Sequence, residues 1–222
     1  MNDVTMRLFS GPLSMFGAKA EIAMREKGLD FDLVMVPFKT AYEPKHPEVL
    51  RINPKRQVPV LIHGDLEIFD STQIFEYLED LKPEPALWPR EARARARARQ
   101  LELKSDEVYF PYIIRQMGLQ HDLAGPDATA ARAGAAAFHQ QIEALLADRQ
   151  FLAGDFGYAD IAFFMAQLFG ERLGAPFDGS MPRLAAWRGR MTGRASVRAV
   201  AKPMAGFLAA NGRFVPAFMR EL

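Results

Sequence analysis

Apolar and polar positions follow two different periods in the first part of the chain. Short apolar runs bounded by turn residues predict four strands, at 6–9, 31–38, 58–62 and 66–69. The run at 31–38 is apolar on both faces, which is typical of a buried parallel strand. The helical period predicts helices at 14–27, within 40–52 and at 71–81. This order of strands and helices predicts a thioredoxin-like α/β domain.

The first predicted helix has the pattern of an amphipathic surface helix. Met15, Ala18 and Ile22 share an apolar face. We expect Lys19 to lie with the charged residues on the solvent side. Gly28 follows as a suitable helix stop.

After residue 82 the pattern is helical throughout. The segment 82–89 contains three prolines and reads as a stiff connector. Further on, the run 161–169 is apolar almost all round, which predicts a central buried helix. An amphipathic helical face is formed by Phe138, Ile142, Leu145 and Leu146. We therefore predict three parts: a thioredoxin-like domain over 1–82, a linker over 83–90 and an all-α domain over 91–222.

Composition and charge are those of an ordinary globular protein. The 222 residues are 49% hydrophobic and 25% charged, with a formal net charge of +1. Such a charge gives no argument for a nucleic-acid or membrane partner. The arginines at 93, 95, 97 and 99 alternate with alanine, and helical residues two apart point about 200° away from each other, so they form no single basic stripe. No signal peptide and no apolar run of ~20 residues is present, so we expect a cytoplasmic protein.

The chain contains no cysteine. Disulfides, thiolate metal ligands and a cysteine nucleophile are therefore excluded, and any thiol chemistry must come from a bound small molecule. The four histidines are scattered without metal-ligand spacing, so no metal site is expected.

The segment around Gln57, Val58 and Pro59 carries the first candidate chemistry. A proline just before a short apolar strand suits a bend that leaves backbone groups of the preceding residue facing outward. Asp70 and Ser71 then open a helix, whose N–H groups can bind a carboxylate. Together these features suit an extended, zwitterionic peptide. A strand, a hairpin and a capped helix without a ligand are the alternative interpretation.

Four segments in this order resemble the glutathione transferase superfamily, in particular its bacterial serine-type members. They are residues 8–16, 53–61, 70–80 and 151–161. The resemblance covers nearly the whole chain and implies the same two-domain fold. It also implies an enzyme that activates the thiol of glutathione, its co-substrate, for attack on a hydrophobic electrophile.

The resemblance places a hydroxyl donor to the glutathione sulfur near the first helix. Tyrosine-type members have a tyrosine where this chain has Phe9, which has no donor. Serine-type members have a serine at the helix start, and here that residue is Ser14. Ser10 is the competing candidate. A free thiol with a pKa of about 8.5 is mostly protonated at neutral pH, so a donor that favours the thiolate is needed.

The resemblance also assigns the binding of the glutathione peptide. Val58 is expected to pair through its backbone with the cysteinyl residue, next to a cis-Pro59. Ser71 is expected to hold the γ-glutamyl carboxylate and Asp70 to face the γ-glutamyl ammonium. Gln57 is expected near the glycyl end. Many relatives have a lysine in place of Gln57, and Lys39 and Arg56 are the two candidates to supply that charge.

The second substrate is expected between the domains, by the same resemblance. The expected lining residues are Met15, Phe38, Tyr109, Tyr112, Ile113 and Gln116. The resemblance further implies a homodimer. In this family a capping box opens the buried helix near residue 160; here Gly157 replaces the hydroxyl and Asp160 is retained, so we expect Asp160 to serve folding rather than catalysis.

Several functions remain open on the same fold. The Asn-Pro-x-x-Gln-Val-Pro pattern at 53–59 is similar to that of the zeta class, but residues 11–16 lack that class's Ser-Ser-Cys-x-Trp-Arg motif, which disfavours a maleylacetoacetate isomerase. Glutathione-dependent dehalogenation, ether cleavage or another isomerisation remain alternatives to conjugation. A non-catalytic binding protein is the non-enzymatic alternative.

Overall fold

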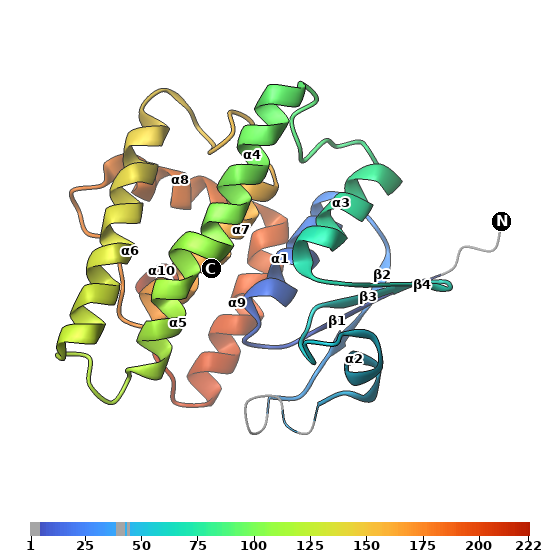
Figure 1. Ribbon diagram of the computed structural model, residues 1–222, viewed down its shortest axis with the longest axis horizontal. Helices are drawn as coiled ribbons and strands as arrows, with labels where there is room; N and C mark the ends of the chain where they lie inside the picture. Colours follow the sequence, from blue (N-terminus) through green and yellow to red (C-terminus); the bar gives the residue numbers. More distant parts are fainter. Residues whose placement is uncertain (1–4, 39–42, 44) are drawn as a thin grey trace.

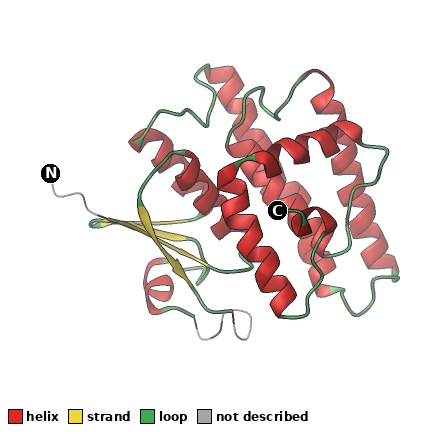
Figure 2. Cartoon of the chain, turned by 180° about the vertical axis from the view of Figure 1, so that it is seen from behind, coloured by secondary structure: helices red, strands yellow, loops and turns green. Residues whose placement is uncertain are grey.

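A mixed four-stranded sheet forms one side of the molecule, and helices fill the other side (Figures 1 and 2). The computed structural model describes residues 5–38, 43 and 45–222. The sheet order is β2-β1-β3-β4, with β1 parallel to β2 and antiparallel to β3. The strands are β1 (Met6–Ser10), β2 (Phe31–Met35), β3 (Val60–His63) and β4 (Leu66–Phe69). This is the thioredoxin-like arrangement that the sequence predicts.

The second strand differs from its prediction in length and burial. β2 ends at Met35 rather than at residue 38, and its residues are half-buried or exposed rather than buried on both faces. Its parallel pairing with β1 is as expected. The difference arises because β2 is an edge strand, so its apolar residues have a strand partner on one side only.

Helices cover both faces of this sheet. The helices of this half are α1 (Met15–Glu26), α2 (Pro47–Ile52) and α3 (Ser71–Leu81). Leu8 and Leu61 point to the face that α1 and α3 cover, whereas their neighbours Phe9 and Val60 point to the α2 face. This alternation is the two-residue period of a strand. α2 is the short helix expected within 40–52, of which residues 40–42 and 44 lie outside the described residues.

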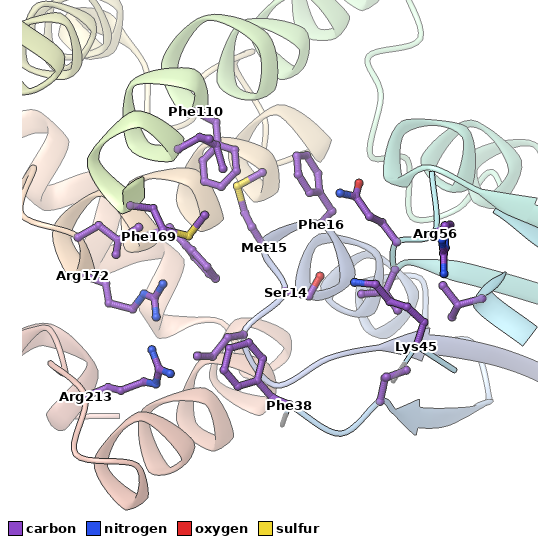
Figure 3. A pocket seen from close by; sticks show the side chains of 18 of the residues that line it. Ser14, Met15, Phe16, Phe38, Lys45, Arg56, Phe110, Phe169, Arg172 and Arg213 are labelled. Carbon is purple, nitrogen blue, oxygen red and sulfur yellow. The ribbon is translucent and has the colours of Figure 1, made fainter. Parts of the chain in front are cut away.

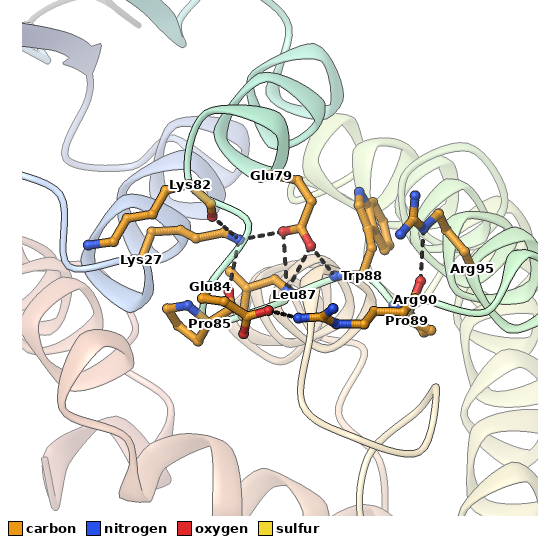
Figure 4. A network of polar contacts seen from close by, with 10 residues as sticks. All are labelled: Lys27, Glu79, Lys82, Glu84, Pro85, Leu87, Trp88, Pro89, Arg90 and Arg95. Atoms are coloured by element: carbon orange, nitrogen blue, oxygen red, sulfur yellow. Dashed lines mark hydrogen bonds and ion pairs between the residues drawn. The ribbon is translucent and has the colours of Figure 1, made fainter.

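The connector between the two halves is held by the buried Lys27 and the partly buried Glu79 (Figure 4). Lys27 Nζ donates to Glu79 Oε2 at 2.5 Å and to the carbonyl oxygens of Lys82 and Pro85 at 2.8 Å each. The Glu79 carboxylate in turn accepts from the backbone N–H groups of Leu87 and Trp88. The connector is therefore fixed to both α1 and α3, in addition to being stiffened by its prolines.

The second half is helical, as predicted. Its elements are α4 (Ala92–Lys104), the π-helix η1 (Ser105–Tyr109), α5 (Phe110–Gly118), α6 (Pro126–Leu145), the 3₁₀ turn η2 (Leu146–Asp148), α7 (Tyr158–Arg172), α8 (Pro182–Gly193), α9 (Ala195–Ala210) and α10 (Ala217–Arg220). α7 is buried from Tyr158 to Gly170 and packs against α1, so the two halves share one core. Within the described residues, we find no helix with the length and apolarity that a membrane crossing requires.

Asp160 caps the buried helix and also ties it to distant segments. Its Oδ2 accepts from Gly157 N at 3.1 Å, the half of the capping box that the sequence predicts. Its Oδ1 accepts from Leu152 N at 2.9 Å and from Trp187 Nε1 at 2.8 Å. Burial raises the pKa of this carboxyl to about 6. Every contact of Asp160 is structural, in agreement with its expected role in folding.

Candidate functional site

A cavity of about 620 Å³ lies between the sheet half and the helical half (Figure 3). Residues of the N-terminal half form what we call the sheet-side wall: Leu13, Ser14, Met15, Phe16, Val36, Phe38, Lys45, His46, Val49, Arg56, Gln57 and Val58. Residues of the C-terminal half form the helix-side wall: Phe110, Ile114, Met117, Gln120, Phe169, Arg172, Leu173, Arg213 and Phe214. The cavity is thus mostly apolar, with polar and cationic groups at particular positions.

Ser14 stands at the point where α1 begins and lines the cavity. Its backbone is extended, its N–H donates to Gly11 O at 3.0 Å, and its Oγ accepts from Gly17 N at 3.0 Å. It is therefore the N-cap of α1, which satisfies one of the free N–H groups of the first turn. Because the Oγ accepts in this bond, its own hydrogen is left for donation to a ligand.

Ser10 and Phe9 are placed differently from Ser14. Ser10 ends β1, is buried and is not among the residues lining the cavity. A methyl group at Gly17 would come within 2.2 Å of Ser10 Oγ, so this hydroxyl lies beneath the first turn of α1. Phe9 points to the α2 face, where its ring is 4.9 Å from that of His46. Of the two serines proposed from the sequence, only Ser14 borders the cavity.

A turn fixed by Asn53 presents Gln57 and Val58 to the cavity. The buried Asn53 accepts from Lys55 N at 2.9 Å and donates to Gln57 O at 2.5 Å. Arg56 at φ 57° closes the turn and also lines the cavity, whereas Lys39 lies outside the described residues. The Val58–Pro59 bond is cis, as the resemblance implies. Strand pairing starts only at residue 60, so Val58 has no ladder partner.

Asp70 and Ser71 form the start of α3. The Asp70 carboxylate caps the helix by accepting from Thr72 N at 3.0 Å, and the residue has φ 78°. Such backbone is rare for a residue other than glycine and is typical of functional sites. Ser71 is 2% exposed and, like Asp70, is not among the residues lining the cavity.

The sheet register nevertheless brings these separate segments to one place. Val60 pairs with Phe69 in the antiparallel β3–β4 ladder. Val58 precedes Val60 by two residues and Ser71 follows Phe69 by two, so both lie at the same end of the sheet. β1, whose Phe9 also pairs with Val60, leads into Ser14 at that same end.

A buried charge cluster below Ser14 was not predicted. Lys19 is fully buried rather than solvent-facing, and its Nζ donates to Glu102 Oε1 at 3.0 Å and Asp106 Oδ2 at 2.5 Å. Glu102 Oε1 also accepts from Thr72 Oγ1 at 2.8 Å. Burial lowers the pKa of Lys19, but the two carboxylates outweigh burial and raise it, so the ammonium stays charged. The cluster connects α1, the start of α3 and α4, although none of its groups lines the cavity.

Two of the six residues expected to contact the second substrate line this cavity, and four do not. Met15 and Phe38 line the cavity, but Tyr109, Tyr112, Ile113 and Gln116 do not. Tyr109 and Ile113 are fully buried, and the Tyr109 hydroxyl lies 3.0 Å from His139 Nε2. Gln116 Nε2 donates to Ala128 O at 2.7 Å.

These four residues were expected at the cavity because the prediction from the sequence placed the wrong face of α5 there. The predicted face turns toward α6 and α7, where Tyr112 packs against Gly134. The cavity is lined instead by Phe110, Ile114 and Met117, which share the i, i+4, i+7 face. Ile114 and Met117 are 47% and 49% exposed. The sequence signal that could have identified them is a second apolar stripe at i, i+4, i+7 spacing, formed with Phe110. In the described residues, no group of three or more His, Asp or Glu side chains could hold a metal ion.

Family models match most of the chain. A model described as the N-terminal domain of glutathione S-transferase matches residues 8–86, and one described as the C-terminal domain of the same family matches residues 105–195. A probable glutathione S-transferase from Oryza sativa subsp. japonica is 34% identical over 195 residues, which covers 80% of this chain and 81% of the relative.

Other relatives match over shorter segments. Glutathione S-transferase 1 from Dianthus caryophyllus is 42% identical over 93 residues, or 41% of each chain. A stringent starvation protein A homolog from Coxiella burnetii is 33% identical over 107 residues, or 47% of this chain and 48% of the relative. The chain thus spans less than half the length of these two relatives.

Solved structures agree with the fold. A glutathione S-transferase from Rhodospirillum rubrum superposes with a TM-score of 0.76 at 28% identity, covering 89% of this chain and 92% of that one. A Tau class glutathione S-transferase from Mangifera indica gives a TM-score of 0.78 at 25% identity, covering 93% and 98%.

Proposed function

We propose that this chain, which belongs to the glutathione S-transferase family, binds glutathione and activates its thiol for attack on a hydrophobic electrophile. One observation carries the proposal. The start of α1 at Ser14, the strand-like residue Val58 and the start of α3 at Ser71 meet at one end of the sheet. Two of these three border an apolar cavity, so a bound peptide there would present its sulfur to a second, apolar substrate.

The α1 start supplies the activation. Ser14 donates its hydroxyl hydrogen to the sulfur, since its oxygen already accepts from Gly17 N. The free N–H groups of the first turn add positive potential at the same point. Both interactions favour the thiolate over the thiol, so they lower the pKa of the bound thiol and the proton leaves to solvent.

The sheet end and the α3 start supply the binding. Val58 pairs with the cysteinyl residue of glutathione through its free backbone groups. Ser71 and the α3 N–H groups hold the γ-glutamyl carboxylate. Asp70, whose Oδ1 is engaged as a cap, faces the γ-glutamyl ammonium with its remaining oxygen. Gln57 and Arg56 lie toward the glycyl end, where the Arg56 guanidinium provides the charge that Gln57 lacks.

Calorimetry with glutathione tests this proposal directly. Ser71→Ala should weaken binding by about 1–3 kcal/mol, the scale for a lost hydrogen bond to a charged group. Ser180→Ala, which alters an exposed serine bound to Asp178, is the matched control and should bind as the unchanged protein does. Absence of binding by the unchanged protein at millimolar glutathione would overturn the proposal.

The narrower assignments are part of the same proposal. We propose a serine-type enzyme that acts in the cytoplasm as a homodimer and conjugates glutathione to its electrophile. Sedimentation equilibrium at micromolar concentration should give twice the chain mass of 24.9 kDa, and a single chain mass would contradict the dimer. Similarity to stringent starvation protein A homologs keeps a non-catalytic role as the second candidate; turnover of any electrophile with glutathione separates the two.

A further inference from the structure

The buried charge cluster of Lys19, Glu102 and Asp106 contacts two helices of the proposed glutathione site. Glu102 of α4 is 2% exposed, and its Oε1 accepts from Lys19 Nζ at 3.0 Å and from Thr72 Oγ1 at 2.8 Å. Lys19 belongs to α1, and Thr72 belongs to the first turn of α3. One carboxylate oxygen of the helical half therefore binds both helices whose starts hold glutathione in the proposed function.

Thr72 is part of the turn that binds the γ-glutamyl group in the proposed function. It follows Ser71 directly, and its own N–H donates to Asp70 Oδ1 at 3.0 Å. Its backbone therefore takes part in the cap of α3, while its side chain is bound to Glu102. A displacement of Thr72 would move Asp70 and Ser71 with it, because the three residues form one turn.

The hydrogen bond from Thr72 to Glu102 has a buried carboxylate as its acceptor. Hydrogen bonds to a charged acceptor are stronger than those between neutral groups. The ion pair with the fully buried Lys19 supplies the opposite charge, and Lys19 Nζ also donates to Asp106 Oδ2 at 2.5 Å. The Glu102 carboxylate is therefore held in place by α1 and offers Thr72 a fixed partner.

A second contact joins α3 and α4 at the surface. Arg99 Nε of α4 donates to Glu76 Oε1 of α3 at 2.9 Å, and both side chains reach solvent. Exposed ion pairs of this kind stabilise a fold little, because water and salt screen them. The contact that fixes the start of α3 relative to α4 is therefore the buried one.

We infer that Glu102 is a positioning residue for glutathione and acts through the hydroxyl of Thr72. It holds the first turn of α3 at the distance from the start of α1 that the bound peptide requires. This inference rests on the proposed function. A site that already has its bound geometry binds more tightly, because less ordering is left to occur when the ligand arrives.

Glu102 acts on the peptide without touching it. It is buried and is not among the residues lining the cavity, and Thr72 stands between it and Ser71. Loss of the Thr72 hydroxyl and loss of the Glu102 charge should therefore affect glutathione by the same route. Two changes on one route are not additive, which a double-mutant cycle can measure.

Calorimetry with glutathione tests the inference on Thr72→Val, which removes the hydroxyl and keeps the branched shape of the side chain. The Kd for glutathione should rise by about tenfold, the scale of a lost hydrogen bond to a charged group. Thr72→Ser keeps the hydroxyl and should bind nearly as tightly as the unchanged protein. Glu76→Gln weakens the exposed contact between the same two helices and is the matched control, which should leave the Kd unchanged.

Two further measurements locate the effect. γ-Glutamylcysteine has the γ-glutamyl group but no glycine, so Thr72→Val should weaken its binding by the same factor as that of glutathione. Glu102→Gln keeps an acceptor oxygen for Thr72 but loses the charge, so it should weaken glutathione binding by a smaller factor. Combined with Thr72→Val, it should weaken binding no further.

The outcomes separate this inference from the proposed function. Unchanged glutathione binding by Thr72→Val would overturn the positioning role while the transferase assignment stands. Equal losses in Thr72→Val and Thr72→Ser, or a loss for glutathione without one for γ-glutamylcysteine, would also overturn it. A full additional effect of Glu102→Gln in the double variant would show that Glu102 acts by another route, which overturns it as well. Failure of the unchanged protein to bind glutathione would instead contradict the proposed function.

Discussion

The two walls of the cavity are built by different means. On the sheet-side wall, Ser14 and Gln57 are each fixed by a bond within a few residues of sequence: Ser14 Oγ accepts from Gly17 N, and Gln57 O accepts from Asn53 Nδ2. The helix-side wall combines residues from α5, from the end of α7 and from the segment after α9. Their positions depend on how whole helices pack.

This difference separates what local sequence determines from what packing determines. A cap, a turn or a residue before a proline has the same geometry wherever its few neighbours are present. Which side of a helix faces a cavity depends on every helix around it. Changes on the sheet-side wall should therefore affect glutathione, and changes on the helix-side wall should affect the electrophile.

The largest expected effect comes from two adjacent isoleucines of α5. Ile113 is fully buried, so Ile113→Ala should lower the free energy of unfolding by about 2–5 kcal/mol. Ile114 is 47% exposed on the cavity, so Ile114→Ala should cost less than about 1 kcal/mol and instead raise the KM for the electrophile. Urea unfolding and steady-state kinetics of both variants check this. The reverse assignment of the two effects would mean that α5 presents its other face.

Predictions from the sequence were correct where local sequence determines the structure and wrong where the packing of helices determines it. The thioredoxin-like order of elements and the helix at 71–81 were predicted correctly, because each has a local signal. The cis bond before Pro59 agrees with what the family resemblance implies. The assignment of Tyr109, Tyr112, Ile113 and Gln116 to the cavity was wrong, because helical spacing identifies an apolar face but not what covers it.

The π-helix before α5 made that assignment harder. Residues 105–109 wind more widely than an α-helix, so the phase of α4 does not continue into α5.

The expectation that Lys19 faces solvent was wrong for a related reason, because its environment depends on contacts between distant segments. A lysine on a helix is normally solvated, and only the approach of Glu102 and Asp106 from another part of the chain makes its burial tolerable. The domain limits at 82 and 90 remain predictions.

Ser14 provides the sharpest test of the sheet-side wall. Ser14→Ala should raise the pKa of bound glutathione and lower kcat/KM by about 10- to 100-fold, because a hydrogen bond to a charged group is lost. Activity should persist, since the α1 N–H groups remain. Spectrophotometric titration of the bound thiolate at about 240 nm measures the pKa of the bound thiol, because the thiolate absorbs there more strongly than the thiol.

Two control variants accompany Ser14→Ala. Ser14→Thr keeps both the hydroxyl and the cap and should recover most of the activity. Ser10→Ala alters a hydroxyl beneath the helix and should leave the titration unchanged. A shifted midpoint in Ser10→Ala with none in Ser14→Ala would transfer the donor role to Ser10. No shift in either would assign the thiolate to backbone N–H groups alone.

The last expected effect is confined to a narrow pH range and concerns Asp160, whose side chain makes both a local helix cap and contacts to distant segments. Its pKa of about 6 in the folded protein lies above the ordinary aspartate value, so between about pH 4 and pH 6 the folded state holds a proton that the unfolded chain has lost. Stability from this group is therefore greatest below that window and falls as the pH rises through it, by at most about 3 kcal/mol, because each whole unit by which the two pKa values differ corresponds to about 1.4 kcal/mol. Asp160→Asn cannot titrate, so its free energy of unfolding should change less with pH across this window than that of the unchanged protein. Urea unfolding of both proteins at several pH values checks this, and parallel curves would show that the three N–H donors around Asp160 keep its carboxylate ionised.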